Sequence, residues 1–452
     1  MTSLITAGNS PRVAIETHGC KLNQADTSVL ASDFLRAGFT LASNDDEVDV
    51  YVVNTCTVTH VADRKARQAL RAARRRHPRA TIVATGCYAQ RDPEGLSGLE
   101  EIDLVLGNTA KAELVRRVLD LRGDSLTPCA EGEEPAAHRV RTGRTRAMVK
   151  IQEGCNQVCA YCIVPRVRGR ERSVPPEQLI GLVNRRIAEG YLEIVLTGTQ
   201  LGTYGYDLPG TGLVDLVRRV LEETDVTRLR MSSLQPQEIG ADLLALWSDR
   251  RLCPHFHIPL QSGSAAILRR MRRRYSPEEY RNAVDRVRRS VPDVSITADV
   301  IVGFPGETEA DFEATRSLCA EVGFAAVHVF PYSTRPGTSA AHFRDAVGAA
   351  TRTTWLQELS SIAASGAAAF RNGFLGTTRL VLWENRVEGA VPGTWSGLTD
   401  NYLRVATHSD EELANAVTDA RLLRLEGNVI RAEIADPRQT QVPIPQPLSP
   451  SP

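Results

Sequence analysis

The stretch Cys155-Asn156-Gln157-Val158-Cys159-Ala160-Tyr161-Cys162 follows a short apolar segment at 148–151. Three thiolates at this spacing can ligate three irons of a [4Fe–4S] cluster and leave the fourth iron open. A zinc site usually takes four ligands, and no fourth cysteine lies nearby. An open iron can chelate the amino and carboxylate groups of S-adenosylmethionine, whose reductive cleavage yields a 5′-deoxyadenosyl radical. The pattern therefore predicts a radical-generating cluster in a loop after the first strand of a barrel.

Strands and helices alternate roughly six times from residue 148 to about residue 369. The predicted strands are 148–151, 192–196, 228–231, 255–258, 295–301 and 326–329. This repetition is typical of a parallel β/α barrel with its site at the carboxyl ends of the strands. We expect an incomplete, TIM-like barrel and place this domain at residues 141–370.

The N-terminal region, placed at residues 11–123, also alternates between strands and helices. We predict strands at 13–15, 48–53 and 80–84 and helices near 27–37 and 64–76, which is the pattern of an open α/β sheet. Cys20, Cys56 and Cys87 each follow one of these strands. Ligands of such sheets lie beyond the carboxyl ends of the strands, so three loops can bring three thiolates together.

The C-terminal region, placed at residues 373–436, changes to short strands separated by Gly and Asn turns. The predicted strands are 378–383, 401–405, 420–425 and 429–434. This pattern predicts a small antiparallel barrel of OB-like size. Residues 124–138 are predicted to be a linker that contains a free surface thiol, Cys129, and residues 437–452 a short disordered tail.

The composition of the 452 residues, 42% hydrophobic and 24% charged, is that of an ordinary globular protein. No apolar run is long enough to span a membrane and no export signal is evident, so a cytoplasmic protein is expected. In that compartment the nine cysteines are expected to be reduced thiols. Cys253 and Cys319 are predicted to be small buried hydrophobes.

The 54 basic and 54 acidic residues balance overall, but the basic ones cluster in three runs. The runs are Arg64, Lys65, Arg67, Arg71, Arg74, Arg75, Arg76 and Arg79; Arg139, Arg141, Arg144, Arg146, Lys150, Arg166, Arg168, Arg170 and Arg172; and Arg269, Arg270, Arg272, Arg273 and Arg274. A single run is more often a solvated helix face. Three runs, two of them beside the cysteines, favour a polyanion such as RNA.

Longer motifs resemble the radical S-adenosylmethionine methylthiotransferases. They are Thr17-His18-Gly19-Cys20-Lys21-Leu22-Asn23-Gln24, Asn54-Thr55-Cys56-Thr57-Val58-Thr59, Thr85-Gly86-Cys87-Tyr88-Ala89-Gln90, the run from Glu153 to Pro165, His257-Ile258-Pro259-Leu260-Gln261-Ser262-Gly263-Ser264, the run from Asp299 to Thr308, and the run from Phe330 to Thr338. The resemblance covers about residues 11–435 and implies that the C-terminal barrel is a TRAM domain.

The resemblance also implies a second [4Fe–4S] cluster on Cys20, Cys56 and Cys87, which carries or receives the sulfur. Two molecules of S-adenosylmethionine would be consumed per product, one as methyl donor and one as radical source. The motifs around Cys20, Cys56 and Cys87 are most like the branch that acts on N6-threonylcarbamoyladenosine at position 37 of tRNA. Isopentenyladenosine of tRNA and an aspartate of a ribosomal protein remain alternatives, as does an RNA-binding protein whose clusters are only structural.

The expected partners are a tRNA anticodon loop and an electron-donor protein, and the sulfur source is left open. The candidate S-adenosylmethionine contacts are Tyr161, Gln200, Ser233, Gln235, Gln261 and Val302. Two of them depart from the pattern: Gln235 stands where this branch usually has Glu, and Thr197-Gly198-Thr199-Gln200 replaces a Gly-Gly-Glu turn. Each glutamine can bind the cofactor as a neutral partner or be a satisfied loop amide. His18 can line the cysteine loop or only pack beside it.

Overall fold

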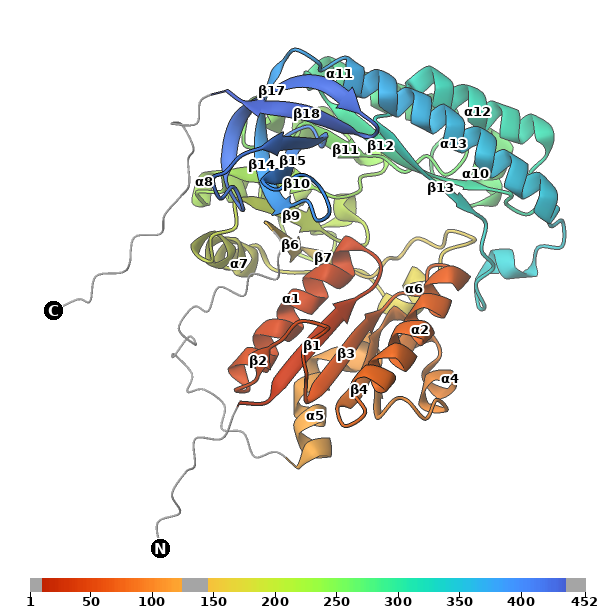
Figure 1. The fold of residues 1–452 in the computed structure, drawn as a ribbon. Helices are drawn as coiled ribbons and strands as arrows, with labels where there is room; N and C mark the ends of the chain where they lie inside the picture. The colour runs from red at the N-terminus through yellow and green to blue at the C-terminus, as the bar shows by residue number, and fades with distance from the viewer. Residues whose placement is uncertain (1–9, 124–144, 436–452) are drawn as a thin grey trace, which may run out of the picture.

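The computed structural model describes residues 10–123 and 145–435, and Figure 1 shows their arrangement. The predicted linker with Cys129, the basic residues Arg139, Arg141 and Arg144, and the predicted tail lie outside the described residues. An α/β sheet lies below a partial barrel, against which a small closed barrel packs (Figure 1). The expected fold class is confirmed.

The N-terminal sheet is parallel, with strand order β2-β1-β3-β4-β5. Its strands are β1 (Arg12–Thr17), β2 (Thr40–Leu41), β3 (Val50–Thr55), β4 (Thr81–Gly86) and β5 (Leu104–Leu106). Its helices are α1 (Lys21–Arg36), α2 (His60–Arg76), α3 (Cys87–Arg91), α4 (Pro93–Ser97) and α5 (Leu114–Arg122), with a 3₁₀ helix η1 (Asn108–Glu113). Every residue of β3 is buried, as in a strand covered on both faces.

Helices α1 and α2 begin earlier than predicted, immediately after the cysteine loops. The prediction started them near residues 27 and 64, but they start at Lys21 and His60. The Thr59 side chain accepts a hydrogen bond from the Ala62 amide and so caps α2. Cys20 is the residue that directly precedes α1. The cysteines are therefore at the junctions between strands and helices.

Six parallel strands follow one another in chain order to form the partial barrel. They are β6 (Arg146–Lys150), β9 (Glu193–Thr197), β10 (Arg228–Met231), β11 (His255–His257), β12 (Ser295–Val302) and β13 (Ala326–Pro331). Bridges between Leu229 and Leu252 and between Ser233 and His257 join the two three-stranded halves. A short ribbon of β7 (Gln152–Glu153) and β8 (Arg172–Ser173) flanks the loop that carries Cys155, Cys159 and Cys162, which is called the radical cysteine loop below.

The barrel helices cover the outer face of these strands (Figure 1). They are α7 (Pro176–Ala188), α8 (Leu213–Glu223), α9 (Ala241–Ala245), α10 (Ala265–Arg270), α11 (Pro277–Ser290), α12 (Glu309–Val322) and α13 (Ala349–Asn372), with 3₁₀ helices η2 (Leu201–Thr203), η3 (Pro236–Glu238), η4 (Leu246–Ser248) and η5 (Ser339–His342). Helix α6 (Val164–Arg168) lies instead at the junction with the N-terminal sheet. Alternate strand residues such as Leu229, Phe256 and Ala298 join the core under these helices. The residues between them point to the inner face.

The C-terminal barrel is closed, with strand order β14-β15-β16-β18-β17. Its strands are β14 (Thr378–Arg386), β15 (Thr394–Thr399), β16 (Arg404–His408), β17 (Val417–Glu426) and β18 (Val429–Ile434). The predicted small antiparallel barrel is confirmed except for one strand pair, because β18 closes the barrel by pairing in parallel with β16. The prediction missed β15 and began β16 too early, since Tyr402 has a positive φ of 72° that interrupts the strand.

No helix in the described ranges is long and apolar enough to cross a membrane.

Candidate active site

The radical cysteine loop lies between β7 and α6, at the carboxyl end of the barrel. Gly154, with a φ of 78°, lets the loop turn tightly: a Cβ there would lie 1.9 Å from the Arg170 carbonyl oxygen. The Cys155 amide donates to the Gly169 carbonyl at 3.1 Å, and the Ala160 amide to the Met271 carbonyl at 2.9 Å. Backbone contacts from two other segments therefore fix where Cys155, Cys159 and Cys162 point.

Burial raises the pKa of Cys155 to about 11 and that of Cys162 to about 12, because a buried thiolate loses its hydration. A compensating cation is present: Arg273 Nη1 donates to Cys159 Sγ at 3.4 Å. In the part of the chain that is described, no three His, Cys, Asp or Glu side chains converge on the position of one metal ion. A cluster binds each sulfur through a different iron, so the donor set fits an iron–sulfur cluster.

The second trio of cysteines lies at the carboxyl end of the N-terminal sheet. Thr55 pairs with Gly86 across β3 and β4, so Cys56 and Cys87 follow neighbouring strand ends. Gly19, directly before Cys20, is so close to Cys56 that a Cβ there would lie 2.8 Å from its sulfur. The pKa of Cys56 is raised to about 12, mainly by burial and further by the negative charges of Cys20 and Cys87. The three sulfurs therefore share one environment, and three soft donors suit a second cluster.

The two cysteine trios meet at the junction of the N-terminal sheet and the barrel. Cys87 packs against Ile163 and Val167, which follow Cys162 on the barrel side. Asn108 connects the same two parts, because its Nδ2 donates to the Val167 carbonyl at 2.8 Å and lies 3.5 Å from Cys87 Sγ. A group bound by one trio would thus lie near a group bound by the other.

Two of the six expected cofactor contacts lie directly beside the radical cysteine loop. Cys155 Sγ lies 3.4 Å from Gln200 Oε1. Gln235 Oε1 accepts from Arg273 at 3.2 Å, and its Nε2 donates to Gln157 at 3.3 Å. Both glutamines are therefore tied into the polar network around the loop.

The sequence analysis missed Glu238, a buried carboxylate in the same network. Gln200 Nε2 donates to Glu238 Oε1 at 2.7 Å, and the backbone amide of Gln235 donates to Glu238 Oε2 at 2.8 Å. Burial raises the pKa of Glu238 above its ordinary value. The available signal was its position three residues after Gln235, which is the spacing of a capping box.

Of the other expected contacts, Tyr161 lies within the radical cysteine loop, and Ser233, Gln261 and Val302 lie at or just after neighbouring strand ends. The Tyr161 ring is 6.4 Å from that of Phe304. Ser233 bridges to His257 just after β10, and Gln261, with a φ of 64°, bridges to Val300. Val302 is the buried last residue of β12. The structure thus brings all six near the carboxyl end of the barrel.

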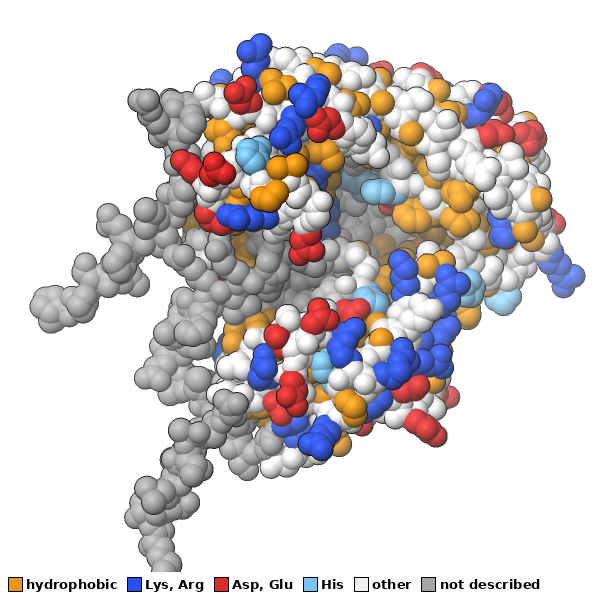
Figure 2. All heavy atoms as spheres, viewed as in Figure 1, with side chains coloured by type: hydrophobic (Ala, Val, Ile, Leu, Met, Phe, Trp, Pro, Cys, Tyr) orange, Lys and Arg blue, Asp and Glu red, His pale blue; other side chains and the backbone are white. Residues whose placement is uncertain are grey.

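The inner face of the barrel is polar rather than apolar. His257 lies between Thr297 and Asp299, with its Nδ1 2.9 Å from Thr297 Oγ1 and its Nε2 3.3 Å from Asp299 Oδ2. The ring of His328, which is exposed, lies 6.3 Å from that of His257. Figure 2 shows a hollow between the sheet domain and the barrel, with histidine side chains at its wall.

Deeper in the barrel, a buried ion network ties it to the C-terminal barrel. Arg230 binds Glu193 at 2.8 Å and lies over the ring of Tyr402 at 4.9 Å. Tyr402 also stacks on His255, with ring centroids 4.4 Å apart, and its ring faces Lys21 at 5.9 Å. Side chains of all three parts of the chain therefore meet around Tyr402.

The basic runs do not all face solvent, which corrects part of the RNA prediction. Basic side chains gather over α2, where Arg64, Lys65 and Arg75 are exposed (Figure 2). Arg168 is only 5% exposed and binds Asp26 and Glu153, so it is not available to RNA. Arg273 is directed to Cys159 instead. Arg168 is an exception because the junction with the sheet domain covers α6, and Arg273 because it packs among Cys159, Gln235 and Tyr275 of the barrel.

The remaining predictions have simple outcomes. Cys253 and Cys319 are each 2% exposed, so the prediction that they are buried is confirmed. The ring of His18 packs beside the cysteine loop, and its Nε2 lies 2.7 Å from Glu16 Oε1.

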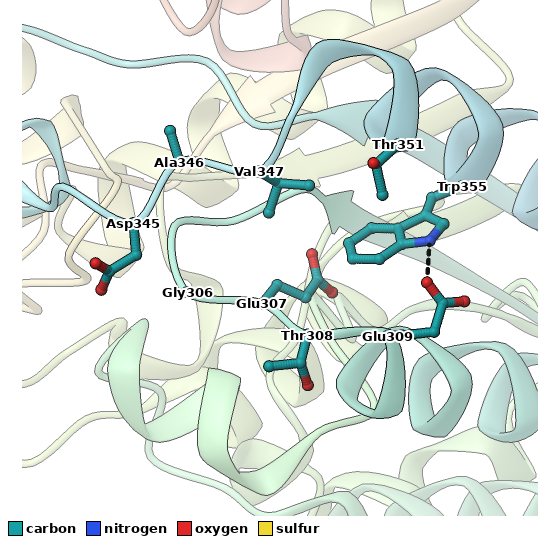
Figure 3. A pocket seen from close by; sticks show the side chains of 9 residues that line it. All are labelled: Gly306, Glu307, Thr308, Glu309, Asp345, Ala346, Val347, Thr351 and Trp355. Atoms are coloured by element: carbon teal, nitrogen blue, oxygen red, sulfur yellow. Dashed lines mark hydrogen bonds between the residues drawn. The ribbon is translucent and has the colours of Figure 1, made fainter.

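A separate cavity of about 570 Å³ lies between the start of α12 and α13, and Glu307 and Trp355 line it (Figure 3).

Two family models match the chain. Residues 12–107 match a family described as uncharacterized protein family UPF0004, and residues 149–319 match the Radical SAM superfamily. A solved structure of a radical S-adenosylmethionine methyltransferase, TsrM, from Kitasatospora setae matches with a TM-score of 0.52 at 15% identity, over 74% of this chain and 77% of that chain. It shares the fold.

Curated relatives match almost the whole chain. Proteins named threonylcarbamoyladenosine tRNA methylthiotransferase MtaB from Aquifex aeolicus and Bacillus subtilis are 38% and 34% identical. The alignments cover 90% and 93% of this chain and 99% and 96% of the relatives. A tRNA-2-methylthio-N(6)-dimethylallyladenosine synthase from Dictyoglomus thermophilum is 35% identical over 93% of this chain and 99% of that relative.

Proposed function

Because the chain belongs to the radical S-adenosylmethionine methylthiotransferase family, we propose that it methylthiolates N6-threonylcarbamoyladenosine at position 37 of tRNA. The product would be 2-methylthio-N6-threonylcarbamoyladenosine. Relatives that carry this activity in their names are 34–38% identical to the chain. The dimethylallyladenosine synthase is 35% identical, so identity alone does not select between the two substrates.

The polar inner face of the barrel is the observation that supports the threonylcarbamoyl substrate. This substituent carries a carboxylate, a hydroxyl and amide groups, whereas a dimethylallyl group is a hydrocarbon. A hydrocarbon offers no hydrogen-bonding group to His257, Asp299 or His328, whereas the carboxylate, hydroxyl and amide groups of the threonylcarbamoyl substituent can bond to such side chains. His328 is exposed toward solvent and can bind a carboxylate when it is protonated.

Each cysteine trio is proposed to hold a [4Fe–4S] cluster: Cys155, Cys159 and Cys162 the radical cluster, and Cys20, Cys56 and Cys87 the auxiliary cluster. When bound, the clusters supply electron transfer to S-adenosylmethionine and a site for the sulfur that is transferred. Two molecules of S-adenosylmethionine would be used per product, one for methyl transfer and one for radical generation. An electron-donor protein would supply the electron, and the sulfur source stays open.

The protein's own groups would bind and orient the cofactor. Gln200 and Gln235 lie beside the radical loop, and Glu238 supplies a carboxylate that neither glutamine carries. A buried carboxylate suits the amino group of S-adenosylmethionine, because opposite charges attract strongly where water is excluded. Tyr161, Ser233, Gln261 and Val302 are proposed to complete the cofactor pocket.

The exposed basic face of α2 is proposed to contact the tRNA backbone, since Arg and Lys hold phosphates without reading sequence. An unstacked base of the anticodon loop could then enter the hollow between sheet and barrel. We assign residues 11–123 to the auxiliary-cluster domain, 141–370 to the radical domain and 373–436 to a TRAM domain. A cytoplasmic location follows from the tRNA substrate.

Mass spectrometry of tRNA nucleosides from a deletion strain tests the proposal. We expect the 2-methylthio form to vanish and N6-threonylcarbamoyladenosine to accumulate. Loss of the methylthiolated dimethylallyladenosine, or of a modified ribosomal-protein aspartate, would instead assign the alternative substrates. If anaerobically reconstituted protein with dithionite and S-adenosylmethionine made no 5′-deoxyadenosine, clusters with only a structural role would be the better account.

A further inference from the structure

Arg335, from the loop after β13, reaches into the sheet domain beside Cys56. It is 1% exposed, and its Nη1 donates to the Thr57 carbonyl at 3.1 Å and to Asp63 Oδ2 at 2.7 Å. The Thr57 hydroxyl donates to the other oxygen of Asp63 at 2.6 Å. An arginine of the barrel therefore holds the residue that directly follows Cys56.

A second arginine of the barrel, Arg168, makes the corresponding contact near Cys20. Its guanidinium binds Asp26 of α1 at 3.1 Å and Glu153 of β7 at 2.7 Å. It also donates to the side chain of Asn23, which in turn donates to the His18 carbonyl at 2.7 Å. The turn that carries Cys20 is thus held from the barrel side.

The third cysteine has a barrel contact of its own, made by packing rather than by charge. Cys87 lies against Ile163 and Val167, and Asn108 reaches from the sheet domain to the Val167 carbonyl at 2.8 Å. All three loops of the second trio are therefore held in part by the barrel.

Both arginine contacts require the two parts of the chain to be in place. A buried charge is strongly unfavourable unless it is paired, so Asp63 and Arg335 stabilise each other only across the junction. Arg91 also binds Asp63, at 3.2 Å, but it does not contact Thr57 in the described structure. Without Arg335, the Cys56 loop would lose the contact that fixes its backbone.

We propose that the radical domain completes the auxiliary-cluster site, with Arg335 and Arg168 as positioning residues that set the spacing of Cys20, Cys56 and Cys87. This inference rests on the proposed function only in taking that trio as cluster ligands. It means that the auxiliary cluster assembles only when the sheet domain is packed against the barrel. The radical cluster, whose cysteines lie in one loop, assembles without that packing.

The test compares Arg335→Met, Arg335→Lys and, as a matched control, Arg281→Met, which removes an exposed ion pair with Glu321 on the barrel surface. After anaerobic reconstitution, the wild type and Arg281→Met should hold about eight irons per chain, and Arg335→Met about four. Reductive cleavage of S-adenosylmethionine should persist in Arg335→Met, because the radical cluster remains. Lysine can still donate to Thr57 and Asp63, so Arg335→Lys should recover most of the iron.

Hydrogen exchange of the metal-free chains provides a readout that does not depend on any cluster. Amides of residues 55–63 should exchange at least tenfold faster in Arg335→Met than in Arg281→Met. Unchanged exchange, or about eight irons in Arg335→Met, would overturn the inference. A wild type that held only about four irons, with normal protection of 55–63, would instead count against the auxiliary cluster of the proposed function.

Discussion

Arg273 places its Nη1 3.4 Å from the sulfur of Cys159, and its Nη2 3.2 Å from Gln235 Oε1. The guanidinium therefore connects a cysteine of the radical loop to a candidate cofactor contact. A fixed positive charge beside a thiolate favours the more reduced, more negative state of whatever that thiolate binds. We therefore expect Arg273 to help set the reduction potential of a cluster bound by the radical cysteine loop.

Arg273→Met should lower the reduction potential of the radical cluster, so that a given electron donor reduces less of it. Reductive cleavage of S-adenosylmethionine should then slow about 10- to 100-fold, the usual cost of removing a partner of a metal ligand. Iron content should stay unchanged, because no ligand is lost. Redox titration followed by electron paramagnetic resonance measures the potential, and Arg273→Lys should recover part of the shift. An unchanged potential in Arg273→Met would show that the arginine serves only packing.

Gln200→Glu should weaken the binding of S-adenosylmethionine about tenfold, although it places a glutamate at the position that ends the Gly-Gly-Glu turn described above. Gln200 donates to Glu238 at 2.7 Å, so a second carboxylate would face the first and repel it. Equilibrium dialysis of the reconstituted enzyme measures the affinity. The double variant Gln200→Glu/Glu238→Gln exchanges the two groups and should recover affinity to within about threefold. Tighter binding by the single variant would contradict this account of Glu238.

His328→Ala should raise the apparent KM for tRNA about tenfold, which corresponds to the loss of about 1.4 kcal/mol from one charged hydrogen bond. Formation of 5′-deoxyadenosine without tRNA should not change, because the ring contacts of His328 in the described structure are with His257 and Phe330. His408→Ala, at an exposed position in the C-terminal barrel, is the control. Equal KM values for His328→Ala and the wild type would remove the inner face of the barrel from substrate recognition.

The sequence located the cysteines well because their signals are local. Cys155, Cys159 and Cys162 lie in one loop, and strand ends placed Cys20, Cys56 and Cys87 at one edge of a parallel sheet. Partners distant in the chain could not be found in this way. In the sequence, Arg168 is part of a basic run and Arg335 is part of the motif from Phe330 to Thr338. Only the packing of the sheet against the barrel shows that they bind Asp26 and Asp63, respectively.

The C-terminal barrel shows a second limit. Alternating residues predict strands, but they do not say which strands pair, so the parallel contact of β16 with β18 was missed. Glu238 was missed for a related reason: its spacing from Gln235 indicates a helix cap, whereas its contact with Gln200 depends on how two strand ends are juxtaposed.

Stability should depend on pH through Glu307. The pKa of Glu307 is raised from the ordinary 4.5 to about 7: burial and the negative charge of Asp311 raise it, and the Phe304 and Gly303 amides act in the opposite direction. Its Oε1 is buried without a hydrogen-bond partner among the described residues. The folded state thus holds the proton more tightly than the unfolded state. The contribution of protonated Glu307 to the free energy of unfolding is fully present below pH 4.5 and is lost as the pH rises through about 7.

The free energy of unfolding should fall by at most about 3 kcal/mol between pH 4.5 and 7 as Glu307 loses its preference for the folded state. Glu307→Gln cannot ionise and should remove most of this dependence, so it should melt at a higher temperature than the wild type at pH 8 and at a similar one at pH 5. Anaerobic thermal melts at the two pH values test this. If the melting temperatures of the wild type and Glu307→Gln differed by the same amount at both pH values, the pH dependence of stability could not be assigned to Glu307.

The most direct test of the whole account is one anaerobic assay with tRNA that contains N6-threonylcarbamoyladenosine, run on the wild type and on Cys56→Ala. The account predicts that the wild type makes both 5′-deoxyadenosine and the 2-methylthio nucleoside, while Cys56→Ala makes only 5′-deoxyadenosine. A wild type that cleaves S-adenosylmethionine but leaves this nucleoside unchanged, or a Cys56→Ala variant that still methylthiolates it, would contradict it.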